Sequence, residues 1–286
     1  MTEIILARES VALSVSIEDF KRRIHHPCFS EAMHSKVGRI HLPVARLCNI
    51  HCLYCERRIG EFYHSLRPGV AARVIRPSKV RDYIRRALAE CPSIAVIAVA
   101  GPGEPLYNKE TFESLRIARK YFPNKKLCVC TNGLLLPDKV KELWKLGVEF
   151  LTVTINAVDP QTGARIYSFA NHRGKLHRGV KAAELLAKNQ FAGIAMAVRA
   201  GMEVKVNSVY IPGMNDADLP AIARAAASLG VRMMNLMPLI PSGRLAGRKA
   251  PTCAQLKKMR VRCEKVIPQF RLCKQCRADA CGIPGE

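Results

Sequence analysis

Six apolar segments alternate with amphipathic segments along most of this 286-residue chain, and this alternation limits the fold more than any other feature. The strand-like segments are 40–47, 94–100, 126–130, 150–156, 204–211 and 233–240. The segments with helical periodicity are 78–91, 109–122, 137–146, 175–201 and 217–229. A chain that alternates strands and helices in this way is predicted to form a parallel sheet with right-handed crossovers.

The apolar pattern also indicates how the sheet is covered. Segment 94–100 reads IAVIAVA, as expected for a parallel strand with helices on one face and a packed interior on the other. Segment 78–91 places Val80 and Ile84 on one helical face, with Ser78 predicted as its cap. Six strand–helix units fall short of a closed (β/α)8 barrel. We therefore predict an α/β fold, a partial (β/α)6 barrel that is open on one side.

Two segments lie outside the alternation, and both carry residues that bind metals. One contains His26 and Cys28, and the other contains a basic stretch with helical character, 252–267, followed by Cys273 and Cys276. We predict three parts, namely a metal-ligating N-terminal segment at 1–38, the barrel at 39–243 and a metal-ligating C-terminal segment at 244–286. Both end segments are expected to cover the open mouth of the barrel.

Three cysteines follow the first predicted strand, at the edge where ligands of parallel α/β folds collect. Cys48, Cys52 and Cys55 have the spacing C-x3-C-x2-C. Three thiolates can hold three irons of a [4Fe–4S] cube, which leaves the fourth iron open. An open iron beside S-adenosylmethionine (SAM) is what radical chemistry on that cofactor requires. Zinc is the alternative, but a zinc site normally closes with a second cysteine pair, and none follows Cys55 within the next thirty residues.

A Gly-Pro-Gly-Glu turn follows the second predicted strand. Gly101 and Gly103 let the backbone approach a ligand, and Glu104 can accept a hydrogen bond from a ligand ammonium group. Alone this is only a turn, but after the cysteine loop it predicts a site for the methionine moiety of SAM. The other predicted cofactor contacts are Tyr54, whose ring can stack on adenine, and Thr131, Asn132, Asn156, Asn207 and Ser208 near strand ends. Polar residues at these positions can instead cap helices.

The chain has twelve cysteines, which in a cytosolic protein indicate metal ligation or packing rather than disulfides. Cys273 and Cys276 form half of a metal site, so its other ligands must come from elsewhere. Cys128 and Cys130 share one face of their strand and can either ligate or pack in the interior. A zinc site that Cys281 and a histidine complete is the alternative for the C-terminal pair.

The formal net charge of +23 favours anionic partners, such as nucleic acid, an acidic protein or an anionic cluster. The basic residues are spread along the chain and aromatic residues make up only 6%, which is thin for base stacking, so no nucleic-acid partner is expected. No run of about 18 apolar residues occurs, and the first residues lack the order of a signal peptide. We therefore expect a cytoplasmic location and no membrane partner.

These motifs together resemble one known family, the NifB maturases of nitrogenase cofactor assembly, from residue 25 to the end of the chain. The matching segments are HPCFSEAMH (26–34), RIHLPVARLCNIHCLYC (39–55), RPGV (67–70), AGPGEPL (100–106), KLCVCTNGL (126–134), TVTINAVDP (152–160), KVNSVYIPGMND (205–216), NLMPLI (235–240) and CKQCRADACG (273–282). Such a density of matches is well beyond that of a general radical SAM resemblance.

The resemblance implies a radical SAM enzyme that fuses two [4Fe–4S] clusters into an eight-iron, carbide-containing precursor. One SAM would methylate a cluster sulfide, and a second would yield the radical that abstracts hydrogen. By this resemblance Cys48, Cys52 and Cys55 hold the SAM cluster. The two substrate clusters would be bound by Cys28, Cys128, Cys273, Cys276 and one histidine, and both His26 and His41 are candidates for that histidine.

This sequence departs from the family pattern at two places. Relatives usually carry a further cysteine shortly after the triad, whereas here Glu61 or His64 is expected to substitute, since carboxylate and imidazole both bind iron. Cys130 and Cys281 are extra thiols that either replace a ligand or only pack.

The resemblance also implies partners, namely iron–sulfur cluster donors, an electron donor such as ferredoxin, and a downstream scaffold or carrier. Two other functions remain open at this point. One is a radical SAM enzyme acting on an organic or RNA substrate with an auxiliary cluster, and the other is a non-catalytic iron–sulfur carrier.

Overall fold

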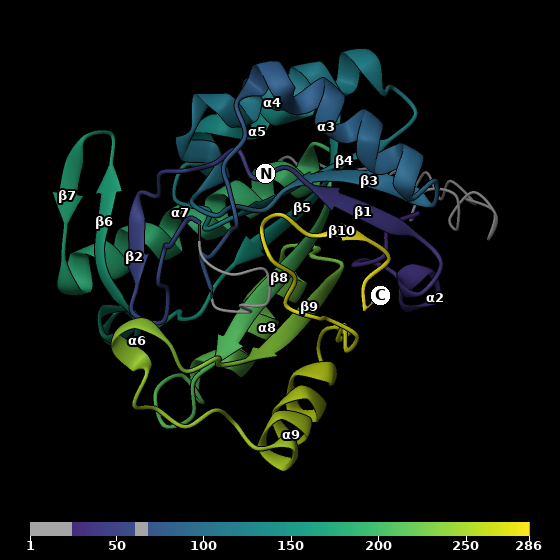
Figure 1. The fold of residues 1–286 in the computed structure, drawn as a ribbon. Coiled ribbons are helices and arrows are strands. Elements are labelled where there is room, and N and C mark those ends of the chain that lie inside the picture. The colour runs from purple at the N-terminus through teal and green to yellow at the C-terminus, as the bar shows by residue number, and fades with distance from the viewer. Residues whose placement is uncertain (1–24, 61–67, 286) are drawn as a thin grey trace, which may run out of the picture.

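The structure is a computed structural model that describes residues 25–60 and 68–285. The described residues form a curled seven-stranded sheet in the order β10-β1-β3-β4-β5-β8-β9 (Figure 1). The strands are β1 Gly38–His41, β3 Ile94–Val99, β4 Lys126–Thr131, β5 Val148–Thr154, β8 Glu203–Tyr210, β9 Met233–Pro238 and β10 Cys281–Gly282. All run parallel except β10, which pairs antiparallel with β1 at the edge. The predicted partial barrel is therefore confirmed.

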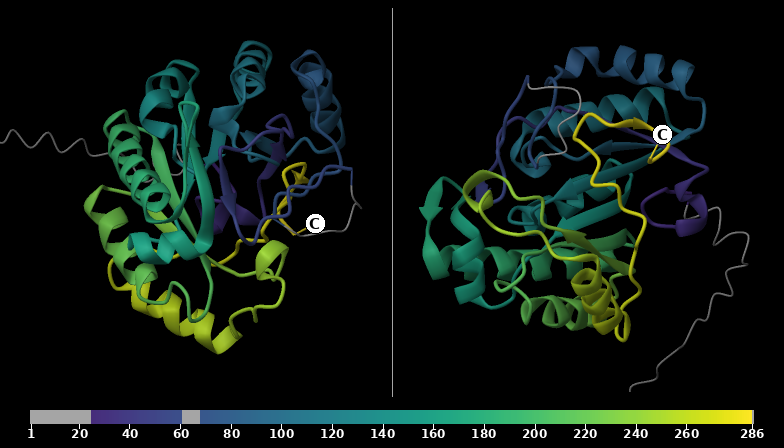
Figure 2. Two further views of the ribbon diagram at one scale, coloured as in Figure 1. Left: turned by 90° about the vertical axis from the view of Figure 1, so that its left-hand side faces the viewer. Right: turned by 60° about the horizontal axis from the view of Figure 1, so that its bottom comes forward.

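Helices cover the outer face of the curled sheet (Figure 2). They are α3 Pro77–Glu90, α4 Lys109–Tyr121, α5 Leu136–Lys145, α7 Gly179–Arg199, α8 Asp218–Ser228 and α9 Cys253–Glu264. Strand residues that face the helices, such as Ile97, Leu127 and Leu151, are fully buried in the main core. Alternate residues of the same strands point to the concave side, where the chemistry-bearing side chains gather.

Two predicted boundaries in the first half of the chain are wrong. The first strand ends at His41, because the residues after it leave the sheet and pair with the turn that follows β3, where Gly103 N–H donates to the Ala45 carbonyl oxygen. Helix α3 starts at Pro77 with Arg76 at the N-cap, so Ser78 lies inside the helix and does not cap it. Proline fits the first helical position because no intrahelical bond needs its N–H.

A small antiparallel sheet of β2 Ile50–Cys52, β6 Tyr167–His172 and β7 Lys175–His177 was not predicted. The helix expected over 175–201 begins only at Gly179, because the residues before it complete a β6–β7 hairpin. Arg173 and Gly174 turn this hairpin at positive φ. The short elements α2 Glu31–His34, α6 Pro160–Ile166, η1 Pro105–Tyr107 and η2 Gly243–Leu245 complete the described secondary structure.

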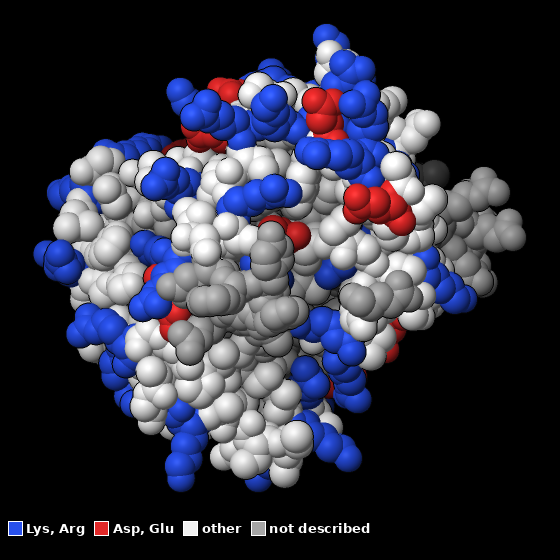
Figure 3. Space-filling view, in the orientation of Figure 1, with Lys and Arg blue, Asp and Glu red and all other residues white. Residues whose placement is uncertain are grey.

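The C-terminal tail returns across the concave side of the sheet after α9 and ends in β10 beside β1 (Figures 1 and 2). Its residues Gln275–Ala278 line a cavity together with strand ends of the barrel. Lysine and arginine side chains are spread over the face that carries the tail, with few acidic side chains among them (Figure 3). None of the described helices is long and apolar enough to cross a membrane.

Candidate functional site

The three cysteines of the C-x3-C-x2-C loop open into one pocket of about 180 Å³. Strand β2 carries Cys52 and is held by β6, and a turn then brings Cys55 N–H to the Cys52 carbonyl oxygen at 3.0 Å. Gly69 lies against this turn, where a Cβ would lie 2.5 Å from the Cys55 sulfur. Three thiols around one pocket fit a [4Fe–4S] cube with an open iron. Within the described ranges, no three His, Cys, Asp or Glu side chains gather at the spacing of a single-ion site.

Burial raises the pKa of all three loop thiols, to about 11 for Cys48. The thiols are therefore protonated without iron, and each must release its proton to become a ligand. Arg57 opposes the shift through its positive charge and hydrogen-bonds the Cys55 thiol. It thus offsets the thiolate charge that ligation creates. The sequence reasoning missed Arg57, whose only signal is a basic residue close behind the last cysteine.

Glu104 lies in the turn after β3, and its carboxylate holds neighbouring residues of the pocket wall in place by hydrogen bonds. It accepts hydrogen bonds from Thr131 Oγ1 at 2.5 Å, from the Asn132 N–H at 2.6 Å and from the Leu106 N–H at 3.0 Å. Burial raises the Glu104 pKa to about 7, against the effect of these donors. Thr131 and Asn132 line the pocket as well, so the structure brings these three predicted cofactor residues together.

The two glycines of the Gly-Pro-Gly-Glu turn differ in how they relate to the cysteine-loop pocket. A Cβ on Gly103 would lie 2.2 Å from the Leu47 carbonyl oxygen, so this glycine permits close approach of the chain segment that leads into the cysteine loop. Gly101 has a φ of 135°, which favours glycine, and it lies outside the pocket lining. Gly103 also lines the cysteine-loop pocket, whereas Gly101 does not, and ligand contact by either glycine stays a prediction.

Tyr54 forms the wall between the cysteine pocket and a neighbouring cavity. Its side chain is 7% exposed and lines both spaces. The Asn156 amide donates to the Tyr54 hydroxyl at 2.8 Å and accepts from the Val209 N–H at 2.8 Å. These bonds fix the ring, whose predicted stacking on adenine stays a prediction.

The two predicted cofactor residues on β8 lie outside this pocket. Ser208 points toward the helix-covered face and its hydroxyl bonds the Ile155 carbonyl oxygen, so its prediction is wrong. Asn207 points to the concave side, where its carboxamide oxygen accepts from Asn235 at 3.2 Å. It does not line the pocket, because β8 lies beyond β5 in the sheet.

Five further cysteines gather on the concave side of the sheet from three separate parts of the chain. Cys128 and Cys130 share the inner face of β4 and hydrogen-bond each other. Cys28 packs against Cys128 and is close enough to Cys273 and Cys276 for their charges to act on its pKa, which burial raises to about 11. We call these five residues the second thiol group. Cys130 also lines the cysteine-loop pocket, so the two groups are neighbours.

Two buried cations lie among these thiols. Lys205 on β8 is 4% exposed, and its ammonium donates to the Cys28 carbonyl oxygen at 3.0 Å. Arg39 on β1 is 5% exposed and donates to the Cys276 sulfur at 2.9 Å. Neither was predicted, although each is a basic residue within a strand whose neighbouring residues are buried.

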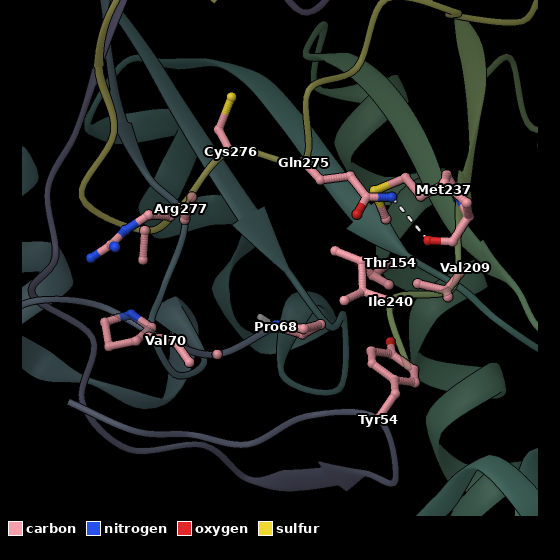
Figure 4. Close-up of a pocket in the computed structure, with 15 residues that line it drawn as sticks. Tyr54, Pro68, Val70, Thr154, Val209, Met237, Ile240, Gln275, Cys276 and Arg277 are labelled. Atoms are coloured by element: carbon pink, nitrogen blue, oxygen red, sulfur yellow. Dashed lines mark hydrogen bonds between the residues drawn. The ribbon is translucent and has the colours of Figure 1, made fainter. Parts of the chain in front are cut away.

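A cavity of about 240 Å³ lies between the cysteine loop and the tail (Figure 4). Tyr54 and Cys276 both line it, and so do the apolar side chains of Val209 and Met237. Gln275 donates to the Pro238 carbonyl oxygen at 2.9 Å and thereby ties the tail over the cavity (Figure 4). The cavity thus lies beside Cys276 of the second thiol group, and Tyr54 separates it from the cysteine-loop pocket.

Comparison with known proteins identifies this arrangement. Residues 42–226 match the Radical SAM superfamily. The chain is 46% identical over 261 residues to the FeMo cofactor biosynthesis protein NifB of Methanocaldococcus jannaschii, a match that covers 91% of this chain and 87% of the relative. The chain belongs to the NifB family. It is also 45% identical to NifB of Methanocaldococcus infernus, with 91% and 86% covered. NifB of Klebsiella pneumoniae is 40% identical and longer, so the match covers 91% of this chain and 57% of that protein.

Solved structures share the fold of this NifB family member. SuiB of Streptococcus suis superposes with a TM-score of 0.56 at 12% identity, over 77% of this chain and 44% of that one. Methylornithine synthase, PylB, gives a TM-score of 0.53 at 13% identity, over 88% and 70%. As a radical SAM protein, the chain uses a [4Fe–4S] cluster and SAM as its cofactor pair.

Three further ligand candidates were predicted, namely Glu61, His64 and Cys281. Glu61 and His64 lie outside the described residues. Cys281 is exposed on β10, where its charge interacts with Cys91 rather than with the second thiol group. A zinc site that joins Cys281 to Cys273 and Cys276 is therefore not formed.

Proposed function

We propose that this NifB family member fuses two [4Fe–4S] substrate clusters into an eight-iron, carbide-containing precursor of the nitrogenase cofactor, with carbon and radical both drawn from SAM. The observation that carries the proposal is the second thiol group beside the SAM loop. A carrier has no need of the SAM loop. An enzyme acting on an organic substrate with one auxiliary cluster needs at most four further thiols, whereas five thiols from three chain segments gather here.

Cys48, Cys52 and Cys55 would hold the resident cluster, which together with SAM supplies methyl transfer and hydrogen abstraction when both are bound. The other pocket residues orient the cofactor. Glu104 keeps an acceptor position after its three protein donors, so it can bind the SAM ammonium group. Tyr54 shields the pocket from the neighbouring cavity.

The second thiol group would hold the substrate clusters through Cys28, Cys128, Cys273 and Cys276. Cys130 is a further thiol on the same inner face, available where the usual family cysteine is missing. Val209 and Met237 give the 240 Å³ cavity an apolar wall beside Cys276. An apolar wall favours the exclusion of water, which protects reactive clusters and the carbon that is being transferred.

His41 is the better-placed histidine ligand. Its Nδ1 donates to the Arg277 carbonyl oxygen at 2.7 Å, which leaves the Nε2 lone pair free, as in most metal-binding histidines. Burial lowers the His41 pKa to about 4, so the ring is neutral. In His26 the Nδ1 accepts from the Cys28 N–H at 3.0 Å, which places the proton on the buried Nε2. His26 therefore orients Cys28 instead of binding iron.

Three kinds of partner would complete this reaction, because the chain itself supplies neither iron nor electrons. They are iron–sulfur cluster donors, an electron donor such as ferredoxin, and a scaffold or carrier that accepts the product. The net charge of +23 favours association with acidic proteins.

Anaerobic reconstitution followed by iron and sulfide analysis tests the proposal. We expect about twelve irons per chain in three cubes, and conversion of two of these cubes to an eight-iron product when SAM and reductant are added. A chain that holds about four to eight irons and forms no eight-iron product would instead fit an enzyme with an organic substrate. Cluster transfer that needs no SAM would identify a carrier.

A further inference from the structure

Lys205 is a buried cation that has no anionic partner among the described residues. Its ammonium group donates to the Cys28 carbonyl oxygen at 3.0 Å. It also lies over the rings of Phe29, at 5.0 Å from the centroid, and Phe270, at 5.2 Å. The residue is only 4% exposed. One carbonyl and two rings compensate only part of the lost hydration of an ammonium ion.

Such a cation is costly to bury, and lysines that are fully buried in proteins are normally paired with a carboxylate. The position of Lys205 makes it available to an anion that enters the site. It points to the concave side of β8, on the face that also carries Val209 at the cavity wall. Its positive charge acts on the proposed ligand thiols of Cys28 and Cys128 and on the neighbouring thiol of Cys130.

The proposed function supplies an anion of a definite chemical class for Lys205 to bind. An iron–sulfur cube bound by thiolates carries net negative charge and exposes inorganic sulfides, which accept hydrogen bonds. We propose that Lys205 binds the substrate cluster at Cys28 and Cys128, donating a hydrogen bond to one of its sulfurs and neutralising part of its charge. This inference rests on the proposed function, since it requires a substrate cluster at the second thiol group.

The test compares Lys205→Met, which keeps the side-chain length without the charge, with Lys205→Arg, which keeps the charge. Lys126→Met is the matched control, because Lys126 on β4 is also a strand lysine but pairs with Glu149 on β5 and does not line the cavity. Each chain is reconstituted anaerobically. We then measure iron release to a chelator, the reduction potential of the substrate clusters, and the melting temperature without iron.

We expect Lys205→Met to release the substrate-cluster iron on the order of tenfold faster. Its cluster potential should become more negative, because loss of a positive charge destabilises the more negative reduced state. Without iron this variant should melt about 3 °C higher, since an unpaired buried charge is gone. Lys205→Arg should restore the potential, and the control should behave like the wild-type chain.

Unchanged iron release together with an unchanged potential in Lys205→Met would overturn the inference. A lower melting temperature with those two results would show that Lys205 only anchors the N-terminal segment through the Cys28 carbonyl group. If the wild-type chain itself holds only about four irons, the proposed function fails and the inference falls with it. The two failures are therefore distinguishable.

Discussion

The two thiol groups of this molecule are built in opposite ways. Cys48, Cys52 and Cys55 come from one short loop, which is supported by the pairing of β2 with the distant strand β6 and by close approach at the glycine at 69. The second thiol group comes from the N-terminal segment, from β4 and from the tail, and it exists only when the sheet and the tail are both in place. The loop group can therefore be found from spacing, whereas the second group is a product of the fold.

Both groups nevertheless meet the same electrostatic requirement. Thiols in buried surroundings resist ionisation, and iron binding turns several of them into thiolates within a small volume. Arg57 provides the opposing charge at the loop, and Lys205 and Arg39 provide it at the second group. The comparison teaches that each of the two thiol groups lies beside at least one basic side chain.

The largest effect is expected when one ligand of the loop group is removed and the second thiol group is left intact. Cys52→Ala removes a ligand of the SAM cluster, so SAM cleavage should fall by at least about 10³-fold, because an iron position without its thiolate is lost. Cleavage is measured by the 5′-deoxyadenosine formed under reducing, anaerobic conditions. Cys263→Ala, which removes a thiol of α9 that is buried in the main core and belongs to neither group, is the control and should cleave SAM normally. Normal cleavage by Cys52→Ala would contradict the ligand assignment.

The next largest effect is expected when one ligand of the second thiol group is removed and the loop group is left intact. Cys276→Ala should lower formation of the eight-iron product about 100-fold and leave SAM cleavage within about twofold of wild type, since ligand loss weakens a metal site at least as much as loss of its outer-shell partners. Product is followed by its electronic absorption and iron content. Cys253→Ala, an exposed thiol at the start of α9, serves as the control. Cluster fusion that survives in Cys276→Ala would show that the tail holds no substrate cluster.

A change in the turn after β3 tests whether close packing against other segments shapes the cysteine loop. Gly103→Ala places a Cβ 2.2 Å from the Leu47 carbonyl oxygen, so the free energy of unfolding should fall by about 3 kcal/mol. Thermal or urea unfolding of the iron-free chain measures this. Gly213→Ala is a strained but uncrowded comparison, with positive φ and no atom near the added Cβ, and it should cost less. Equal losses for the two variants would argue against close packing at Gly103.

Substitution of each of the two histidines tests which of them is a ligand at the second thiol group. His41→Ala should lower retention of substrate-cluster iron about tenfold, because a ligand is lost. His26→Ala should have a smaller effect on iron retention, since His26 accepts a bond from the Cys28 N–H and packs against Phe29 and Phe150 without binding iron. Electron spin-echo spectroscopy of the reconstituted chain reports a nitrogen ligand directly, and its signal should vanish in His41→Ala and persist in His26→Ala. The reverse pattern would exchange the two roles.

The smallest effect concerns pH. Burial holds the Glu104 pKa near 7 in the folded chain, above its value of 4.5 when exposed, so the folded state binds the extra proton between these values. Stability of the iron-free chain should therefore decrease as pH rises from 5 to 7, by on the order of 1 kcal/mol from this group. Glu104→Gln should flatten that slope. A slope that is the same in both chains would show that Glu104 does not contribute.

Much of the fold was accessible from the sequence because apolar periodicity is a local property. The six parallel strands and their helices were predicted, with errors where a local pattern met a tertiary contact, as at residues 42–47 and in the β6–β7 hairpin. The same contrast between local patterns and tertiary contacts holds for the site residues. The loop triad and Glu104 were found from motif spacing, whereas Lys205 and Arg39 were missed because only the folded sheet places them among thiols. Ser208 was misplaced because strand alternation reverses its direction relative to Asn207.

The central claim is that the second thiol group binds iron–sulfur clusters independently of the SAM loop. Iron and sulfide analysis of an anaerobically reconstituted chain in which Cys48, Cys52 and Cys55 are all replaced by alanine tests it most directly. We predict that this variant retains about eight irons, arranged as two cubes, while losing all SAM cleavage. A variant that retains no iron would contradict the claim.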